Sequence, residues 1–326
     1  MVRIATFNLE TLDDHPSGGA DFADRLAMLR PQMRRLRADV LCLQEVNARD
    51  EVGPDGVRAR RLPALDRLLE GTEYRDFQRV VSQGRGGRPA DRHNLVILSR
   101  YPVLEQDQVW HHLMPPPAYT PPVGADGPAS MEWERPLLHA VLALADGCRL
   151  HVIAVHLRAP RAAFLKGRKG ADGGWRSLAD WAEGFFAATV KAAGQALEVR
   201  LLVERIFDAE PEALIAVCGD FNAGDGEAPL RIVAADEEDA GNGRLATRAL
   251  VILDRGLSDS RRFSVIHHGR RVMLDHILVS RSLTGWYLNS EIHNEALGDE
   301  SLSPALVRTP PDSFHAPLVA VFAPPA

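Results

Sequence analysis

Four apolar runs far apart in the chain each end in a side chain that can bind a metal ion or transfer a proton. Each run has the length and the aliphatic content of a buried strand. The runs are residues 4–7 ending at Asn8, 40–44 at Glu45, 151–155 at His156, and 214–219 at Asp220, with Asn222 close behind. Because strands deliver such groups to the open edge of a sheet, the pattern predicts one hydrolytic site built from remote segments.

Apolar residues at spacings of three and four predict three helices. The first covers residues 21–37 and the second residues 58–69. The third covers residues 178–206 and is either one long helix or two in series, because two internal glycines weaken it. Its aromatic stripe, which includes Trp181 and Phe185, is expected to belong to the core.

The remaining segments predict further strands and two long loops. Strands are predicted at residues 94–97, 137–144 and 318–322, with a hairpin at 263–280 that turns at His268-Gly269. A Pro-rich loop spans residues 115–128 and a polar, Gly-rich loop spans residues 222–249. Since strands outnumber helices and the helices occur singly between strand groups, we expect stacked sheets with helices outside, in a single domain over residues 1–326.

Composition predicts a soluble protein of a reducing compartment. The 326 residues are 45% hydrophobic and 25% charged, as in globular proteins. The first strand begins almost at the N-terminus without a basic and apolar leader, and no apolar run is long enough to span a bilayer. Cys42, Cys148 and Cys218 cannot all pair and are expected to be small buried thiols. We therefore expect a cytoplasmic monomer without a membrane span.

The charge is distributed unevenly. A net charge of −6 does not favour strong sequence-independent binding to nucleic acid. Residues 157–170, directly after His156, nevertheless carry five basic side chains and no acidic one. This basic run leaves two alternatives open, a solvated surface and a binding site for an anionic substrate.

The residue types at the strand ends suit phosphoric ester hydrolysis. That reaction needs a divalent ion on the phosphate, a polarised water and a stabilised leaving oxygen. Glu45, with Asn8 beside it, offers the hard oxygen atoms that Mg²⁺ prefers. Asp220 and Asn222, two positions apart, can direct a carboxylate and an amide at one water and one phosphoryl oxygen. An aspartate from another strand can fix the proton state of a catalytic histidine.

The order and local sequence of these segments resemble the endonuclease/exonuclease/phosphatase superfamily, the deoxyribonuclease-like metal-dependent phosphoesterases. A single triplet such as Gly-Asp-Phe-Asn would be weak, but the ordered set reaches from near the first residue to near the last. The matching segments are residues 6–8 (TFN), 43–46 (LQEV), 94–102 (NLVILSRYP), 155–157 (VHL), 219–222 (GDFN), 274–278 (LDHIL) and 313–317 (SFHAP).

The resemblance implies an α/β (α+β) fold, a four-layered sandwich of two packed, mainly antiparallel β-sheets flanked by helices. It also implies a role for each matching residue. Glu45 resembles the main ligand of Mg²⁺ or Mn²⁺, and Asn8 a second ligand or a substrate-orienting amide. By the same pattern the catalytic residues are Asp220, Asn222, His156 and the pair His315 and Asp275, and the substrate contacts are Asn8, Asn222, His156 and Arg158. Whether Asp220 or the Asp275–His315 pair takes the proton of the water stays open.

One position departs from the family pattern. Relatives commonly have Ser-Asp-His where this chain has Ser313-Phe314-His315, so a hard ligand is missing and the number of metal ions is open. Glu10 or Asp312 is a candidate to compensate. Phe314 also supports the alternative of a catalytically impaired scaffold protein. For an enzyme, the substrate classes are nucleic acids, nucleotides, inositol phosphates and phospholipid head groups.

Some polar residues near these motifs have structural explanations. Asp275 lies among apolar neighbours, where an unpaired carboxylate is costly, so it needs a partner, and His315 is the natural one. His276 points to the opposite strand face and is expected to be structural. Arg135 could reach a phosphate or form a structural salt bridge, and a core role is expected for Trp133.

Overall fold

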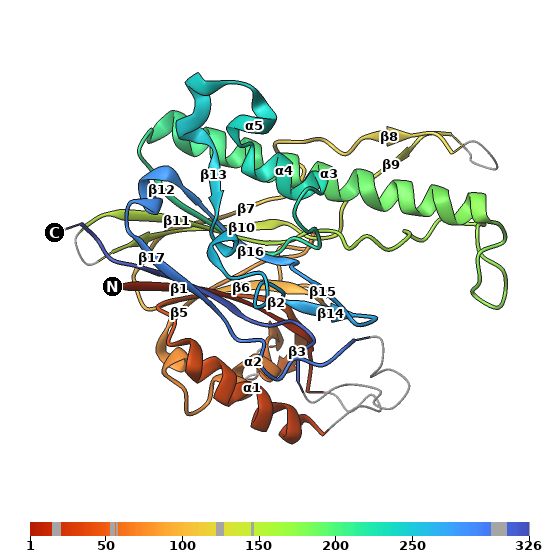
Figure 1. Ribbon diagram of the computed structural model, residues 1–326. Helices are drawn as coiled ribbons and strands as arrows, with labels where there is room; N and C mark the ends of the chain where they lie inside the picture. The colour runs from red at the N-terminus through yellow and green to blue at the C-terminus, as the bar shows by residue number, and fades with distance from the viewer. Residues whose placement is uncertain are drawn as a thin grey trace.

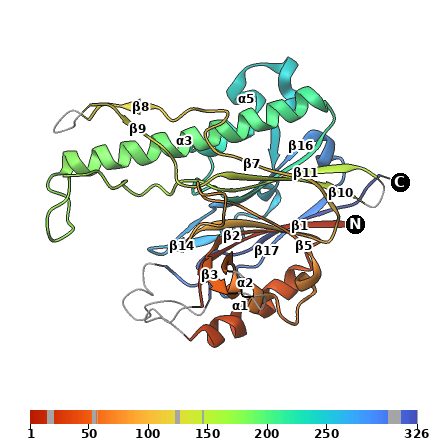
Figure 2. The same cartoon turned by 180° about the vertical axis from the view of Figure 1, so that it is seen from behind.

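The computed structural model contains two six-stranded sheets packed face to face, with helices on both outer sides (Figures 1 and 2). The structure describes residues 1–14, 21–52, 56, 58–121, 127–144, 147–300 and 312–325. The first sheet consists, in spatial order, of β17 (Tyr287–Ile292), β18 (Leu318–Phe322), β1 (Val2–Leu12), β2 (Val40–Val46), β6 (Asn94–Ser99) and β5 (Gln78–Val81). The second consists of β13 (Leu250–Ile252), β16 (Asp275–Ser280), β12 (Leu214–Asp220), β11 (Arg149–His156), β10 (Leu137–Ala143) and β7 (Val103–Val109).

Each sheet is mainly antiparallel but has one parallel pair, β1 with β2 and β11 with β12. In these pairs Asn8 lies opposite Gln44, and His156 lies opposite Asp220. Since parallel strands end at the same edge, each pair delivers its polar endings together. The predicted four-layered sandwich is confirmed, and this pairing explains why distant strand endings meet.

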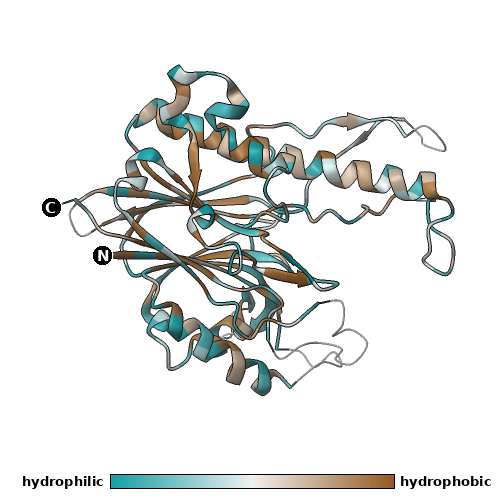
Figure 3. Ribbon diagram, in the orientation of Figure 1, coloured by the Kyte–Doolittle hydropathy of each residue, from teal (hydrophilic) through white to brown (hydrophobic). Residues whose placement is uncertain are grey.

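Three apolar layers hold the sandwich together, and the strands that separate them are predominantly hydrophobic (Figure 3). Inner-face residues such as Ile4 and Val152 fill the space between the sheets. Helices α1 (Phe22–Leu36) and α2 (Pro63–Leu69) cover the outer face of the first sheet through residues such as Met33 and Leu65. Helices α3 (Leu178–Ala209) and α4 (Ala228–Ala234) cover the second sheet through residues such as Val203.

The remaining elements are short. The helical ones are η1 (Glu73–Asp76), α5 (Glu237–Ala240), η2 (Gly243–Arg248), η3 (Leu253–Gly256) and α6 (Arg281–Thr284). The small ladders are β3 (Arg49–Val52) with β4 (Arg58–Arg61), β8 (Ala118–Tyr119) with β9 (Ala129–Ser130), and β14 (Val265–His267) with β15 (Arg270–Val272). No helix in the part of the chain described is long and apolar enough to cross a membrane.

Several element predictions need correction. Residues 58–61 form β4 rather than a helix, because α2 begins only at Pro63, where the fixed ring favours a first helical turn. The polar segment after Asn222 contains α4 and α5 rather than one long loop. The predicted hairpin is limited to β14 and β15, while β16 joins the large sheet. Helix α3 is unbroken.

The prediction that the aromatic stripe of α3 lies in the core is wrong. Trp181 and Phe185 are exposed, because the N-terminal part of α3 extends past the sheets and only its C-terminal part packs on them (Figures 1 and 2). Helical periodicity identified an apolar face correctly, but periodicity carries no information on what covers that face.

Gly219 is needed for the close approach of β11 and β12. A Cβ atom on Gly219 would lie 2.0 Å from the Val155 carbonyl oxygen. We expect Gly219→Ala to lower the free energy of unfolding by about 3 kcal/mol or more, measured by urea denaturation, because backbone must move.

Gly226→Ala is the matched control. Gly226 also has a positive φ, of +80°, but a Cβ atom there would have nothing within 4 Å. We expect a loss of about 1 kcal/mol from the strained backbone alone. Equal losses in the two variants would contradict the steric explanation.

Candidate active site

The candidate site lies where the parallel strands of both sheets end. Asn8 and Glu45 come from the first sheet and Asp220 and Asp275 from the second, while His315 precedes β18. The Asn8 Nδ2 atom lies 3.0 Å from Asp220 Oδ2 and 3.4 Å from Glu45 Oε1. One amide therefore bridges the two sheets at the site.

Glu45 is surrounded by donors. The backbone nitrogen and hydroxyl of Thr11 donate to Glu45 Oε2 at 3.0 and 3.1 Å, and His93 Nδ1 lies 3.3 Å from the same oxygen. Burial alone would raise the pKa of Glu45, but His93 and His156 outweigh burial and hold the pKa well below its usual range. Glu45 is thus an ionised carboxylate at neutral pH.

Asp220 is held by amide groups. The backbone nitrogen of Asn222 donates to Asp220 Oδ1 at 2.8 Å, and Asn222 Nδ2 donates to Asp220 Oδ2 at 3.0 Å. Asn222 adopts a left-handed φ of 49°, which forms the tight turn behind this contact. Burial and the charge of Asp275 raise the pKa of Asp220 to about 7. This carboxyl group can therefore accept or release a proton near neutral pH.

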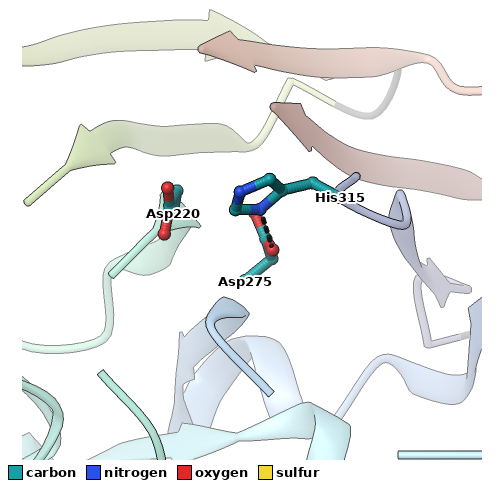
Figure 4. A group of neighbouring side chains, drawn as sticks. All are labelled: Asp220, Asp275 and His315. Atoms are coloured by element: carbon teal, nitrogen blue, oxygen red, sulfur yellow. Dashed lines mark hydrogen bonds and ion pairs between the residues drawn. The ribbon is translucent and has the colours of Figure 1, made fainter. Parts of the chain in front are cut away.

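Asp275 and His315 form a hydrogen-bonded pair. His315 Nδ1 lies 2.8 Å from Asp275 Oδ2, and Figure 4 shows the other ring nitrogen of His315 on the side of Asp220. Burial lowers the pKa of His315, but the Asp275 carboxylate more than compensates and raises this pKa to about 10. His315 is therefore an imidazolium at neutral pH, held in one orientation by Asp275.

His156 and Arg135 line the same site. Arg135 Nη1 lies 2.6 and 2.7 Å from the two ring nitrogens of His156, and His156 Nε2 lies 3.3 Å from Asp220 Oδ2. Burial and the neighbouring Arg135 charge keep the pKa of His156 well below its ordinary value. His156 is thus a neutral ring between the partly buried Arg135 cation and the Asp220 carboxylate.

The segment with the unusual Phe314 is anchored to β1. Ser313 Oγ donates to the Asn8 carbonyl at 2.7 Å, and the Phe314 backbone nitrogen donates to Glu10 Oε2 at 2.7 Å. The Phe314 side chain itself is buried. Burial raises the pKa of Glu10, and the nearby His315 opposes this effect. Glu10 is therefore a further acidic group near His315, besides Asp275 and Asp220, whereas Asp312 accepts a hydrogen bond from Gln32.

The donor set fits a hard divalent cation. Asp220 and Asp275 occupy directly opposite positions on β12 and β16, so their buried charges repel each other. Ligand-type atoms of Asp220, Asp275 and His315 all lie within 4.8 Å of one another. Among the described residues, Asp275 Oδ1 is a buried oxygen without a hydrogen-bond partner. A cation beside Asp275 Oδ1 would satisfy this oxygen and relieve the repulsion between the two carboxylates.

The structure also shows how the predicted residues are distributed. It gathers Asn8, Glu45, His156, Asp220, Asn222, Asp275 and His315. Asn8 Oδ1 accepts from the Glu10 backbone nitrogen, which favours the orienting role of Asn8 over a ligand role. The Arg158 backbone nitrogen donates to Gln195, and the substrate contact of Arg158 stays a prediction.

Two contributors were missed or left open by the sequence. His93, which contacts Glu45, stands one residue before β6 with a left-handed φ of 60°. Its position before the strand of Asn94 was the available signal. Arg135 lies against His156 at the site rather than only in a structural salt bridge, and the contact with His156 distinguishes these two possibilities.

Comparisons with known proteins identify the family and the fold. The model of the endonuclease/exonuclease/phosphatase family matches residues 5–295. No curated protein sequence matches the chain significantly.

Solved structures share the fold at low sequence identity. A family protein from Leptotrichia buccalis has a TM-score of 0.57 at 13% identity, with 99% of this chain and 100% of that chain covered. Truncated TDP2 from Caenorhabditis elegans has a TM-score of 0.57 at 14% identity, covering 99% and 98%. An AP endonuclease from Archaeoglobus fulgidus has a TM-score of 0.52 at 17% identity, covering 99% of each chain.

Replacing Asp275 by asparagine should change the titration of His315. We expect the pKa of His315 in metal-free Asp275→Asn protein to fall from about 10 by at least about one unit, because the attracting charge is removed. The pKa of Asp220 should fall as well, because the repelling charge is removed. NMR titration of the imidazole measures the first effect.

The pKa of His151, which lies near Glu210 instead, serves as the internal control and should not change. An unchanged His315 titration in the variant would show that Asp275 does not hold the imidazolium.

Proposed function

Since the chain belongs to the endonuclease/exonuclease/phosphatase family, we propose that it is a hydrolase of phosphoric ester bonds that depends on Mg²⁺ or Mn²⁺. The proposed reaction is attack of water on a phosphodiester, as in a nuclease, or on a phosphomonoester. The observation that carries the proposal is the meeting of Glu45, Asp220 and the Asp275–His315 pair at one end of both sheets.

The charge of each side chain suggests its role in the proposed reaction. Glu45, with Asp275 nearby, would hold the metal ion, which when bound neutralises phosphate oxygens. Arg135 and neutral His156, which lie side by side near Asp220, would bind the phosphate group of the substrate. The amides of Asn8 and Asn222 keep the Asp220 carboxylate in one orientation.

The two unusual pKa values favour one assignment of the proton transfers. His315, with a pKa of about 10, already carries its proton at neutral pH and can donate toward developing negative charge. Asp220, with a pKa of about 7, is suited to accept the proton of the attacking water. We therefore assign the base to Asp220 and the stabilising cation to His315.

The alternative of a catalytically impaired scaffold is less well supported. This alternative depends on Phe314, which replaces a metal ligand of the family pattern. The backbone nitrogen of Phe314 nevertheless donates to the Glu10 carboxylate, and the Asp275–His315 pair is intact. Cytoplasmic location, a monomeric state and the substrate class, including inositol phosphates and phospholipid head groups, stay predictions.

Hydrolysis of an aryl phosphodiester, bis(p-nitrophenyl) phosphate, tests the activity. With Mg²⁺ or Mn²⁺ added we expect turnover, and Asp220→Asn or His315→Gln should each lower kcat/KM by about 10²-fold or more, since each removes a proton-transfer group. The monoester p-nitrophenyl phosphate, assayed in parallel, separates the two reaction types.

A second buried Asp–His pair provides the matched control. His276 Nδ1 lies 2.9 Å from Asp254 Oδ1, and the alternation of side chains along β16 puts His276 on the opposite strand face from Asp275. His276→Gln should lower stability but leave kcat/KM of the folded enzyme within about threefold. No turnover by the wild-type protein with either metal would favour the scaffold alternative.

Metal binding should stabilise the fold. We expect saturating Mg²⁺ or Mn²⁺ to raise the free energy of unfolding by about 2.7 kcal/mol at a hundredfold excess over Kd, measured by thermal unfolding. Glu45→Gln should abolish most of this gain because it removes an ionised ligand. Glu105→Gln, at an exposed ion pair with Arg149, should keep it. An equal gain in all three proteins would contradict the assigned site.

A further inference from the structure

The N-terminal part of α3 presents its large apolar side chains to solvent, whereas its acidic side chains and small residues such as Ala187 face the protein. Leu178, Trp181, Phe185 and Phe186 have exposed fractions of 85%, 44%, 38% and 50%. Their spacing of three, four and one residues puts them on one side of the helix. Surface helices normally show the reverse arrangement.

The acidic residues of this stretch are directed inward. Asp180 and Glu183 are the charged residues between 178 and 190, and both pair with Arg168, at 3.2 and 2.8 Å. Their side chains are only 13% and 9% exposed. The Tyr119 hydroxyl, on β8, also donates to Glu183 at 3.0 Å. The polar groups of the helix are thus used internally and leave its outer side apolar.

Close packing fixes the helix in this orientation. The Gly184 carbonyl accepts from the Ala163 backbone nitrogen at 2.8 Å, and a Cβ atom on Gly184 would lie 2.9 Å from the Trp175 ring. On the outer side the rings of Trp181 and Phe185 stack with centroids 5.6 Å apart. The helix cannot turn its apolar side inward without breaking these contacts.

We call residues 158–190 the arm. The arm carries six basic and three acidic residues, a net charge of +3, in a chain of net charge −6. Arg161 has a side chain that is 80% exposed, Phe164 is 73% exposed, and Lys166 and Arg176 are exposed as well. Exposed aromatic residues therefore occur together with exposed cations.

The arm is adjacent to the candidate active site. It begins two residues after His156, and the free end of α3 projects past the sheets on the side where β14 and β15 lie (Figures 1 and 2). β15 leads directly into Asp275 at the start of β16. A surface bound by the arm would therefore face the strand ends that form the site.

We propose that the arm docks the protein onto the surface of an anionic lipid bilayer. Aromatic and aliphatic side chains on one side of a helix insert at the boundary of head groups and acyl chains, while neighbouring Lys and Arg are attracted to anionic lipids. The apolar side chains and the net positive charge of the arm satisfy both requirements.

Two other occupants fit the arm less well. A second copy of the chain in a twofold dimer would set the positively charged arm against itself, and like charges would oppose association. Single-stranded nucleic acid stacks on aromatic residues within a groove that follows its backbone. Here Trp181 and Phe185 lie on the outer side of a projecting helix. This surface is convex and offers no groove for a nucleic-acid strand.

Vesicle binding tests the proposal with the full chain and without any requirement for turnover, so its failure is distinct from a failure of the proposed activity. The probe is phosphatidylcholine vesicles with and without phosphatidylserine, in a flotation assay. We expect binding that needs phosphatidylserine and weakens with salt. The triple variant Leu178→Ser, Trp181→Ser, Phe185→Ser should need about tenfold or more lipid for half-maximal binding.

A matched control removes equally exposed apolar residues elsewhere. Leu104, Leu245 and Leu288 are 50%, 53% and 54% exposed, and their triple serine variant should bind like wild type. Circular dichroism should show that both variants keep their helices. As a second measurement, Lys166→Glu with Arg176→Glu should weaken binding by about fivefold per residue, without touching the apolar side.

Three results would overturn the proposal. The first is that the wild-type protein does not bind phosphatidylserine vesicles, or that the triple serine variant of the arm binds them as well as the wild-type protein does. The second is that the wild-type protein binds a single-stranded oligonucleotide but not vesicles, and that the triple variant at Leu178, Trp181 and Phe185 loses this oligonucleotide binding. The third is a wild-type dimer in sedimentation that the arm variant converts to a monomer, again without vesicle binding.

Discussion

Two buried carboxylates, Asp220 and Asp275, stand directly opposite each other on neighbouring antiparallel strands, and the site depends on this unfavourable pairing. Like charges in such positions destabilise a sheet. The charge of His315 compensates in part, and its raised pKa is the consequence. The raised pKa of Asp220 has the same origin, together with burial. The fold thus creates a place where a divalent cation is favourable and where a proton can move near neutral pH.

The surrounding contacts keep this arrangement from relaxing. Asn8 bridges from the first sheet to Asp220 in the second, so the two layers cannot separate without breaking the site. The close approach of β11 and β12 at Gly219 sets the position of Asp220 relative to His156. Holding like charges close together lowers the stability of the fold at this place, as is usual for functional sites.

The arm, which lies outside the sandwich, differs from the site in exposing apolar side chains. The projecting end of α3 exposes apolar residues that a folded monomer would normally bury, and its acids are already paired with Arg168. The site and the arm are linked by the chain itself, since the basic run starts immediately after the strand of His156. On scaffolds of this kind, segments beyond the strand ends distinguish one substrate class from another.

The sequence by itself determined the strands, their polar endings and the family, because apolar runs and short ordered motifs are local properties of the chain. It also indicated that Asp275 needs a partner, since an unpaired carboxylate among apolar neighbours is costly. Only the tertiary structure decided that His93 and Arg135 join the site, because the packing of the two sheets determines which side chains they contact. It likewise decided that Trp181 is exposed, since the length of a sheet, not the period of a helix, determines how much of that helix is covered.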